Sequence, residues 1–302
     1  MPELPDLTVY VEALERRVVG TTLESLQIFN PFLLRSTTPP PNEFSGAAVE
    51  AVSRVGKRIV LEFERELFMI FHLMISGRLR WRPPGARAPK RGTLASFGFS
   101  AGTLLVTEAG TKRRASLHLV RGRQGLSAFD RGGLEISQIE AQTFGDRLRL
   151  ENHTLKRCLT DPRLFAGIGN AYSDEILHRA RLSPFKQSSQ LAEDEAERLF
   201  DAAARVLEEW TDRLRKEAGD DFPEKVTAFR DGMAVHGRFR QPCPDCGAPV
   251  QRIVFVESEA NYCPGCQTGR RILADRSLSR LLKADWPRTL DELERLDPSG
   301  NR

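Results

Sequence analysis

The chain has 302 residues, of which 40% are hydrophobic and 28% are charged, and its net charge is +4. This length can bury two or more hydrophobic cores, which excludes a small scaffold stabilised mainly by disulfides. It contains no run of 18 apolar residues and no apolar signal core near its start, so we expect a cytoplasmic protein with no membrane segment.

The first six residues, MPELPD, combine rigidity with chemical function. Once Met1 is removed, Pro2 presents a free secondary amine; an α-amino group titrates near ~8, against ~10.4 for lysine, so more of it is unprotonated at neutral pH. Such an amine can act as a nucleophile, with Glu3 beside it as acid or base. We expect Asp6 to cap a helix that begins at Leu7. An ordinary helix leader is the alternative interpretation.

The segment after this start predicts one helix followed by a β-domain. Apolar residues at Leu7, Val11, Leu14 and Val18 line one face of a helix. From about residue 22 to residue 120, short apolar runs are separated by turn residues: TLESLQIF, AAVEAVSRV, RIVLEF, LFMIFHLM, GTLLVTE and SLHLV. This pattern predicts a β-sandwich or flattened barrel, which we assign to residues 1–128.

Two stretches of this domain are rich in basic residues and contain no acidic ones. Six basic residues lie between Arg78 and Arg91, and five lie between Lys112 and Arg123. Such stretches are typical of proteins that bind polyanions. Lys57 follows a glycine at the start of a strand, where a long cation can extend from a turn toward a bound anion.

A glycine-rich and charged linker, residues 129–140, precedes a helical domain that we place at residues 141–222. Its loop residues Gly167, Gly169 and Asn170 suit close backbone approach, and the amides at the start of the next helix can bind phosphate. A tight turn between two helices is the alternative. We expect the acidic run GDDFPE at the end of this domain to be a solvated connection.

Four of the five cysteines form two C-x2-C pairs separated by sixteen residues: Cys243, Cys246, Cys263 and Cys266. This spacing predicts one tetrahedral zinc ion on a β-hairpin. We assign a zinc finger to residues 230–271, which is too small to build its own core and would depend on the metal to fold. Residues 272–302 have the apolar spacing of one or two helices and no evident chemistry.

Taken together, these motifs resemble the formamidopyrimidine-DNA glycosylase and endonuclease VIII family of bacterial base-excision repair enzymes. The resemblance runs from Met1 to about Gln267 and depends on PELPD, VGKRI, HLMISG, GIGNAYSDEIL and the hairpin that ends in YCPGCQ. It implies an α+β fold: an N-terminal β-sandwich with an N-terminal helix, a helix-two-turn-helix domain that binds DNA, and a C-terminal zinc-finger β-hairpin.

The resemblance also implies a function, that of a DNA glycosylase with abasic-site lyase activity. In such enzymes the damaged nucleotide is flipped out of the duplex, and the proline amine attacks the sugar and forms an iminium whose β/δ-elimination cuts the strand. By position, the catalytic residues are Pro2 (nucleophile), Glu3 (general acid/base) and Lys57 (phosphate contact beside the lesion). The expected DNA-binding residues are Lys156, Asn170, Ile75, Arg113 and Arg114. We expect a monomer that acts on double-stranded DNA with a damaged base or abasic site, at the nucleoid of a bacterial cytoplasm.

Several positions depart from the pattern of this family. Asp6 stands where the family usually has glutamate, and Ile75 where it often has the methionine that fills the gap left by the flipped base. Ala115 stands where an aromatic residue usually follows the arginine of a second filler loop. Ser258 replaces a finger arginine that holds the phosphates flanking the lesion. The run AFRDGMAVHGRFRQPC is short and leaves little room for a lesion-covering loop.

These departures favour a rival hypothesis from another class. The same helices and zinc hairpin could form a module that binds damaged or distorted DNA or RNA without cutting it. The retention of Pro2 and Glu3 favours the enzyme, because binding alone needs no unblocked proline amine.

Overall fold

The computed structural model of the chain describes residues 1–89, 91–110, 112–256 and 258–296. These residues form two compact units. The first unit contains Met1–Gly133 together with Glu208–Ala228, and the second contains Leu134–Leu207 and the chain from Phe229 onward. The expected linker, residues 129–140, spans the boundary between the units, and the end of the expected helical domain belongs to the first unit.

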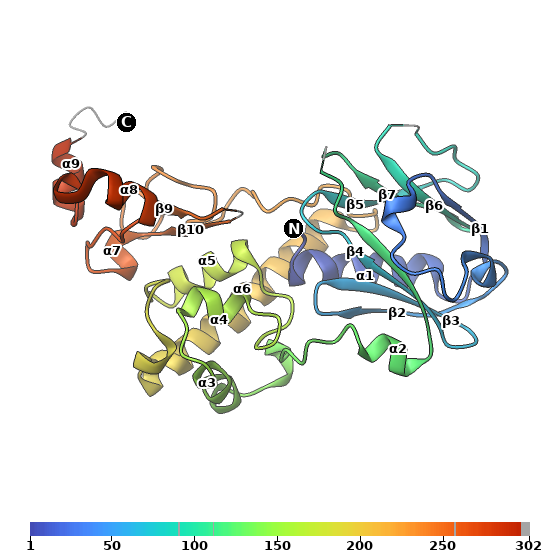
Figure 1. Cartoon of the computed structure of the whole chain (residues 1–302), viewed down its shortest axis with the longest axis horizontal. Coiled ribbons are helices and arrows are strands. Elements are labelled where there is room, and N and C mark those ends of the chain that lie inside the picture. The colour runs from blue at the N-terminus through green and yellow to red at the C-terminus, as the bar shows by residue number, and fades with distance from the viewer. Residues whose placement is uncertain (90, 111, 257, 297–302) are drawn as a thin grey trace. The chain divides into compact units, whose positions relative to one another are not determined.

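The first unit is the predicted β-sandwich, formed by two antiparallel four-stranded sheets that appear as two layers in Figure 1. The first sheet has the order β1-β6-β7-β5. Its strands are β1 (Leu23–Ile28), β6 (Thr93–Phe99), β7 (Gly102–Glu108) and β5 (Gly77–Arg82). The second sheet has the order β2-β3-β4-β8. Its strands are β2 (Val49–Val55), β3 (Arg58–Phe63), β4 (Leu67–His72) and β8 (Ser116–Arg121).

A single hydrophobic core joins the two sheets and the N-terminal helix α1 (Leu4–Val18). Phe71 on β4 meets Phe97 on β6 edge to face, with ring centroids 5.4 Å apart. From α1, Tyr10 and Leu14 are fully buried in the same core. Because α1 packs against β2 and β3, the start of the chain is fixed to the sandwich.

Two strands of the first sheet were not predicted from the sequence. Strand β5 has the sequence GRLRWR, in which the arginines of the first basic stretch alternate with apolar residues. Strand β6, TLASFGF, contains small residues that weaken the hydrophobic signal. In both strands the alternation becomes informative only in the folded sheet, where each strand pairs with β7 and one face packs into the core.

The sequence predicts a solvated connection at GDDFPE, and this holds only for its first half: Gly219, Asp220 and Asp221 are exposed, whereas the second half packs on the sandwich. The Phe222 ring packs 5.6 Å from that of Tyr10 and 6.3 Å from that of Trp81. Glu224 forms ion pairs with Arg80 and Arg82 of β5. The acidic run therefore neutralises part of the basic stretch that was expected to face a polyanion.

The second unit contains the predicted helices and the finger hairpin (Figure 1). Its longer elements are α3 (Ala141–Arg149), α4 (Leu155–Thr160), α5 (Asn170–Arg179), the first part of α6 (Glu193–Ala218), β9 (Gln251–Val254) and β10 (Glu259–Tyr262). Helix α5 packs against β10 and against the short helix α7 (Pro264–Gln267). The C-terminal segment forms α8 (Arg276–Leu282) and α9 (Leu290–Leu296), in agreement with the predicted helices.

The remaining helices are short: α2 (Arg123–Ser127) and the 3-10 turns Pro31–Leu33, Pro41–Phe44, Ile136–Gln138, Ser188–Gln190 and Lys283–Asp285. Within the described residues, none of the helices combines the length and the apolar character needed to cross a bilayer.

Candidate functional site

The N-terminal segment is buried and held by its own side chains. Helix α1 begins at Leu4, three residues earlier than predicted, because Glu3 and Asp6 cap it reciprocally. The Glu3 backbone N–H donates to Oδ2 of Asp6 at 3.0 Å, and the Glu3 carboxylate accepts from the Asp6 backbone N–H. This capping box satisfies two donors at the helix start. Pro2 and Glu3 are both buried, so the terminus has a defined place beside the sandwich.

Burial lowers the pKa of the Met1 amine below its ordinary value. The charge of Glu3 opposes this shift, and the cations Arg78 and Lys57 reinforce it. The charges of Glu3 and Lys57 thus act on the chain terminus, and Pro2 is the residue next to it. A terminal amine at this place is favoured in its neutral, nucleophilic form.

Arg78 belongs to this site although the sequence had indicated only a member of a basic stretch. Its Nε donates to the Val226 carbonyl oxygen at 2.6 Å, and its Nη1 donates to the carbonyl oxygens of Ile75 at 3.0 Å and Gly77 at 2.7 Å. These contacts join strand β5 to the segment after α6 and to the turn that carries Ile75. No pattern in the sequence separates Arg78 from its basic neighbours.

The expected gap-filling residues lie in two loops of the first unit. Ile75 is 53% exposed, in the turn between β4 and β5. Arg113 is exposed and Arg114 is half-buried, in the segment that leads into β8. Ala115 is buried and cannot extend from the surface, which agrees with its description as a departure.

In the second unit the structure brings Lys156 and Asn170 into direct contact. The Lys156 ammonium donates to the Asn170 backbone carbonyl oxygen at 2.7 Å, in the first turn of α5. The same ammonium forms an ion pair with Asp174, which is fully buried. The sequence analysis missed Asp174, although its spacing of four residues from Asn170 places both on one face of a helix.

Asp174 also connects this site to the finger. Nδ1 of His236 lies 2.8 Å from its Oδ2, and the Asn261 side-chain amide donates to the same oxygen at 3.2 Å. The next residue, Glu175, accepts hydrogen bonds from the backbone N–H groups of residues 234–236 at 2.7 to 2.9 Å. Helix α5 is thus the common support of the Lys156 site and the finger.

The four predicted zinc ligands converge at one end of the hairpin. The Sγ atoms of Cys246 and Cys263 are 3.3 Å apart, and those of Cys243 and Cys266 are 3.9 Å apart. Four thiolates at ~2.3 Å from a tetrahedral zinc lie ~3.8 Å from one another, so these separations fit that ion. Burial, together with neighbouring thiols, raises the pKa of Cys263 to about 12, and a bound zinc ion would favour its thiolate form.

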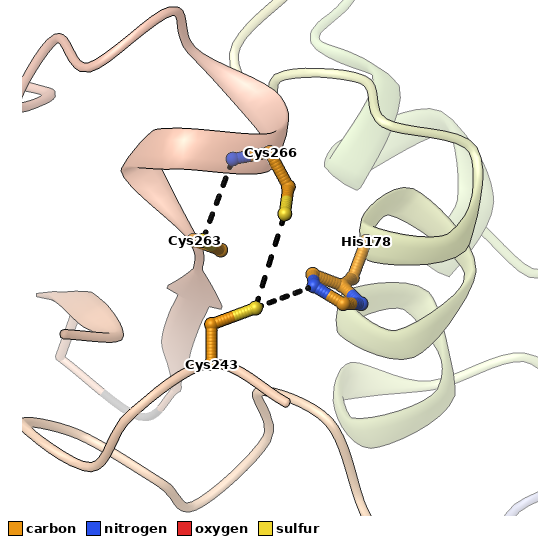
Figure 2. Close-up of side chains that lie close together, drawn as sticks. All are labelled: His178, Cys243, Cys263 and Cys266. Carbon is orange, nitrogen blue, oxygen red and sulfur yellow. Dashed lines mark hydrogen bonds between the residues drawn. The ribbon is translucent and has the colours of Figure 1, made fainter. Parts of the chain in front are cut away.

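A histidine that the sequence did not indicate joins this cluster. His178, at the end of α5, directs its ring toward Cys243, and its Nε2 lies 3.3 Å from that sulfur (Figure 2). One nitrogen of His178 and the sulfurs of Cys243, Cys263 and Cys266 all lie within 4.8 Å of one another. His178 precedes Cys243 by 65 residues, a spacing that carries no metal signature in sequence.

Comparison with known proteins matches the N-terminal, helical and finger parts of the chain to three domain families. Residues 1–116 match the formamidopyrimidine-DNA glycosylase N-terminal domain, residues 134–216 match the H2TH domain of that enzyme, and residues 240–269 match the zinc finger found in FPG and IleRS. An uncharacterised formamidopyrimidine-DNA glycosylase-like protein of Mycobacterium tuberculosis is 44% identical over 129 residues, which cover 43% of this chain and 80% of that protein.

Solved structures give the same result. Lactococcus lactis Fpg in complex with DNA that contains an abasic site has a TM-score of 0.78 at 25% identity, over 88% of this chain and 99% of that one. MutM in complex with DNA that contains carbocyclic 8-oxo-G has a TM-score of 0.78 at 26% identity, over 88% of this chain and all (100%) of that one.

A full-length relative decides the assignment. Formamidopyrimidine-DNA glycosylase of Thermus thermophilus is 34% identical over 277 residues, which cover 88% of this chain and 98% of that enzyme. The chain therefore belongs to the formamidopyrimidine-DNA glycosylase family, whose members are enzymes with both DNA glycosylase and abasic-site lyase activity.

Proposed function

We propose that the chain removes damaged bases from DNA and cuts the strand through a covalent intermediate on Pro2. After removal of Met1, the Pro2 nitrogen attacks C1′ of the damaged nucleotide, the bond from C1′ to the base breaks, and the base leaves with a proton. The bond from C1′ to O4′ then breaks and O4′ takes a proton, which leaves an iminium between C1′ and the Pro2 nitrogen. This iminium acidifies the C2′ proton. Loss of that proton and of the 3′ oxygen breaks the strand by β-elimination, and a second elimination releases the 5′ phosphate.

The observation that carries this proposal is the buried, fixed chain terminus. The reciprocal cap between Glu3 and Asp6 holds the terminus in one position, and burial lowers the pKa of the amine there. A pure binding module needs neither feature, because a protonated, mobile terminus serves electrostatic attraction equally well.

The charges around the terminus fit distinct steps of the reaction. The Glu3 carboxyl is buried beside the amine, where it can deliver a proton to the opening sugar and take one back. Lys57 and Arg78 add positive charge near the terminus, which disfavours protonation of the amine and attracts the phosphates that flank the lesion.

The second unit supplies contacts that hold the DNA backbone. Lys156 and Asn170 lie together at the first turn of α5, where backbone N–H groups and the helix dipole favour a phosphate. One structural zinc, held by Cys243, Cys246, Cys263 and Cys266, stabilises the hairpin. We assign His178 the role of a hydrogen-bond donor to the Cys243 thiolate, since metal-bound thiolates and their neighbours are commonly fixed by such contacts.

The substrate is double-stranded DNA with a damaged base or an abasic site, and one chain acts as a monomer. The similar structures contain DNA with an abasic site or a modified guanine, and the relatives named above are bacterial. We therefore place the protein in a bacterial cytoplasm, at the nucleoid. Because Ser258 lacks a cationic side chain, we assign the protein a preference for abasic sites over oxidised purines in well-paired duplex.

Trapping with borohydride tests the proposal directly. Borohydride added during reaction with abasic-site DNA reduces the iminium to a stable amine, so a cross-linked species is expected whose DNA is attached at Pro2, as peptide mass analysis will show. A protein with an extra N-terminal glycine is the matched control, and it should give no adduct. Equal trapping in both proteins assigns the chemistry to another amine, and no trapping with either favours the binding module.

A further inference from the structure

Glu108, the last residue of β7, forms hydrogen bonds with two loops: the turn between β4 and β5, and the segment that leads into β8. Its side chain is 2% exposed. Its Oε1 accepts from the Ser76 hydroxyl at 2.9 Å, in the turn between β4 and β5. The Arg114 backbone N–H lies 3.1 Å from both carboxylate oxygens, and the Ala115 backbone N–H donates to Oε2 at 3.2 Å.

The two loops approach each other closely at this carboxylate. Gly77, which follows Ser76, pairs with Glu108 in the ladder between β5 and β7. A Cβ atom at Gly110 would lie 3.2 Å from the Ser76 hydroxyl, which is tighter than most such contacts. A buried carboxylate requires donors of this kind, so replacing it leaves several polar groups unsatisfied at once.

Ser76 and Arg114, which form hydrogen bonds with Glu108, are sequence neighbours of the exposed residues of the two loops. Ser76 follows Ile75, which is 53% exposed, and Arg114 follows Arg113, which is exposed. The turn is fixed on its other side as well, because Arg78 donates to the Ile75 carbonyl oxygen at 3.0 Å. Met74 in the same turn has a φ of 52°, a conformation that costs free energy in a non-glycine residue and persists only where its surroundings enforce it.

We propose that Glu108 is a positioning residue that makes Ile75 and Arg113 one preorganised unit for insertion into the base stack. This inference rests on the proposed function, since only an enzyme that extrudes a base must fill the space left behind. Extrusion requires unstacking and unpairing of the base. Two loops whose backbones are held together before contact lose less conformational freedom when their side chains insert than two independent loops would.

The first test needs no DNA. In the natural protein the amide protons of Arg114 and Ala115 should exchange slowly with solvent, because they are bonded to a buried carboxylate. Glu108→Gln presents an amide N–H₂ to these donors in place of one oxygen, and should make both protons exchange faster. Ser76→Ala, which removes only the hydroxyl contact, should give a smaller change in the same direction. If the two amide protons exchange at the same rate in Glu108→Gln, Glu108 does not hold the two loops together, and the inference is wrong whether or not the protein is a glycosylase.

The second test separates positioning from folding. Glu108→Gln should lower excision of a damaged base from fully paired duplex on the order of 10²-fold, the cost of a ~1 Å misplacement in an active site. It should leave cleavage of an abasic site in single-stranded DNA within about twofold, because nothing has to be extruded there. Glu108→Asp should recover part of the lost excision, since it retains an acceptor carboxylate.

Glu62→Gln is the matched control. Glu62 is a glutamate of strand β3, in the other sheet, and forms an ion pair with Arg123 of α2. This variant should change neither the cleavage rates of the two substrates nor the exchange rates of the two amide protons. Equal losses on paired and single-stranded substrates in Glu108→Gln mean that Glu108 only stabilises the fold, and overturn the inference. If the natural protein does not cut abasic DNA, the proposed function is wrong. The exchange rates of the two amide protons still show whether Glu108 holds the two loops together.

Discussion

Nε2 of His178, at the end of helix α5, lies 3.3 Å from Sγ of Cys243 in the finger. Both groups are buried, with exposures of 3% and 2%. A metal-bound thiolate that accepts a hydrogen bond from an adjacent helix is fixed in orientation by that helix. The finger is therefore attached to α5 through its cysteine cluster as well as through Glu175 and Asp174.

This contact predicts the behaviour of zinc in variants. The natural protein should contain one zinc per chain, and His178→Ala should retain it but bind it ~10–100-fold more weakly in competition with a chelator, the usual effect of losing a contact to a metal ligand. Cys246→Ala should lose the metal at purification. His153→Ala, which removes a histidine bonded to Glu151, is the control and should behave as the natural protein. Loss of zinc in His178→Ala with retention in Cys246→Ala makes His178 the fourth ligand.

Glu3 is expected to act more strongly on base loss than on strand cutting. Glu3→Gln removes the ionisable group while keeping a side chain of similar size beside the terminus. We expect a loss of ~10² to 10⁴ in rate on an intact damaged base and a smaller loss on a ready-made abasic site, where no base remains to be expelled. Single-turnover rates on the two substrates measure the difference.

Because Glu3 also caps α1, a control for helix stability is needed. Asp6→Asn keeps an acceptor oxygen for the Glu3 backbone N–H and leaves the Glu3 carboxyl in place, so it should affect both substrates alike and weakly. If Glu3→Gln lowers both rates equally, Glu3 positions the terminus and does not transfer protons.

Ser258 predicts weak retention of lesions in well-paired duplex. The residue is exposed, and its carbonyl oxygen accepts from the Phe255 backbone N–H at 2.8 Å in the hairpin turn. Ser258→Arg should tighten binding to lesion-containing duplex by roughly 1.5–3 kcal/mol, the value of a hydrogen bond to a charged group. It should also steepen the dependence of log Kd on log salt by about one unit, because one more phosphate is neutralised.

Ser258→Gln, which adds length without charge, serves as the control and should leave the salt slope unchanged. A neighbouring cation could already supply this contact: Arg252, on the same hairpin, lies 4.5 Å from the Phe239 ring centroid and 3.6 Å from Glu259. If the natural protein excises 8-oxoguanine from duplex efficiently and Ser258→Arg changes neither quantity, Arg252 is the first residue to replace.

The lowered pKa of His72 predicts that the first unit loses stability in acid. Burial, with the nearby cations Arg58 and Lys57, lowers the pKa of His72 to about 4. In the unfolded chain His72 titrates at about 6.5, so between these two values the unfolded state binds a proton that the folded state does not. The free energy of unfolding should therefore fall as the pH drops from about 6.5 to about 4.

Urea unfolding, followed by near-ultraviolet signals of the first unit, measures this dependence. His72→Gln should flatten the slope within the window and leave it unchanged above it. His153→Gln, in the second unit, should preserve the slope of the natural protein. His118 lies nearby and burial lowers its pKa too, so the double variant with His118→Gln should be flatter still. A slope that is identical in His72→Gln and the natural protein contradicts the assignment.

The sequence by itself determined the parts of this protein that depend on local pattern. Alternating apolar residues predict strands because they can bury one face of a sheet, and six of the eight sandwich strands follow from such runs. The two C-x2-C pairs specify a metal-bound hairpin because four thiolates at this spacing have few other stable arrangements. The catalytic roles proposed for the terminal proline and its glutamate likewise come from local sequence, because both lie within the first six residues.

Only the tertiary structure decided which distant residues meet. His178 reaches the cysteines, Asp174 reaches His236 and Asn261, and Glu224 neutralises two arginines of β5. Each pair joins segments separated by more than sixty residues, and each partner alone has the properties of an ordinary surface or core side chain. A contact of this kind forms because the surrounding core fixes both backbones, so its energy depends on the whole fold and leaves no periodic signal in the chain.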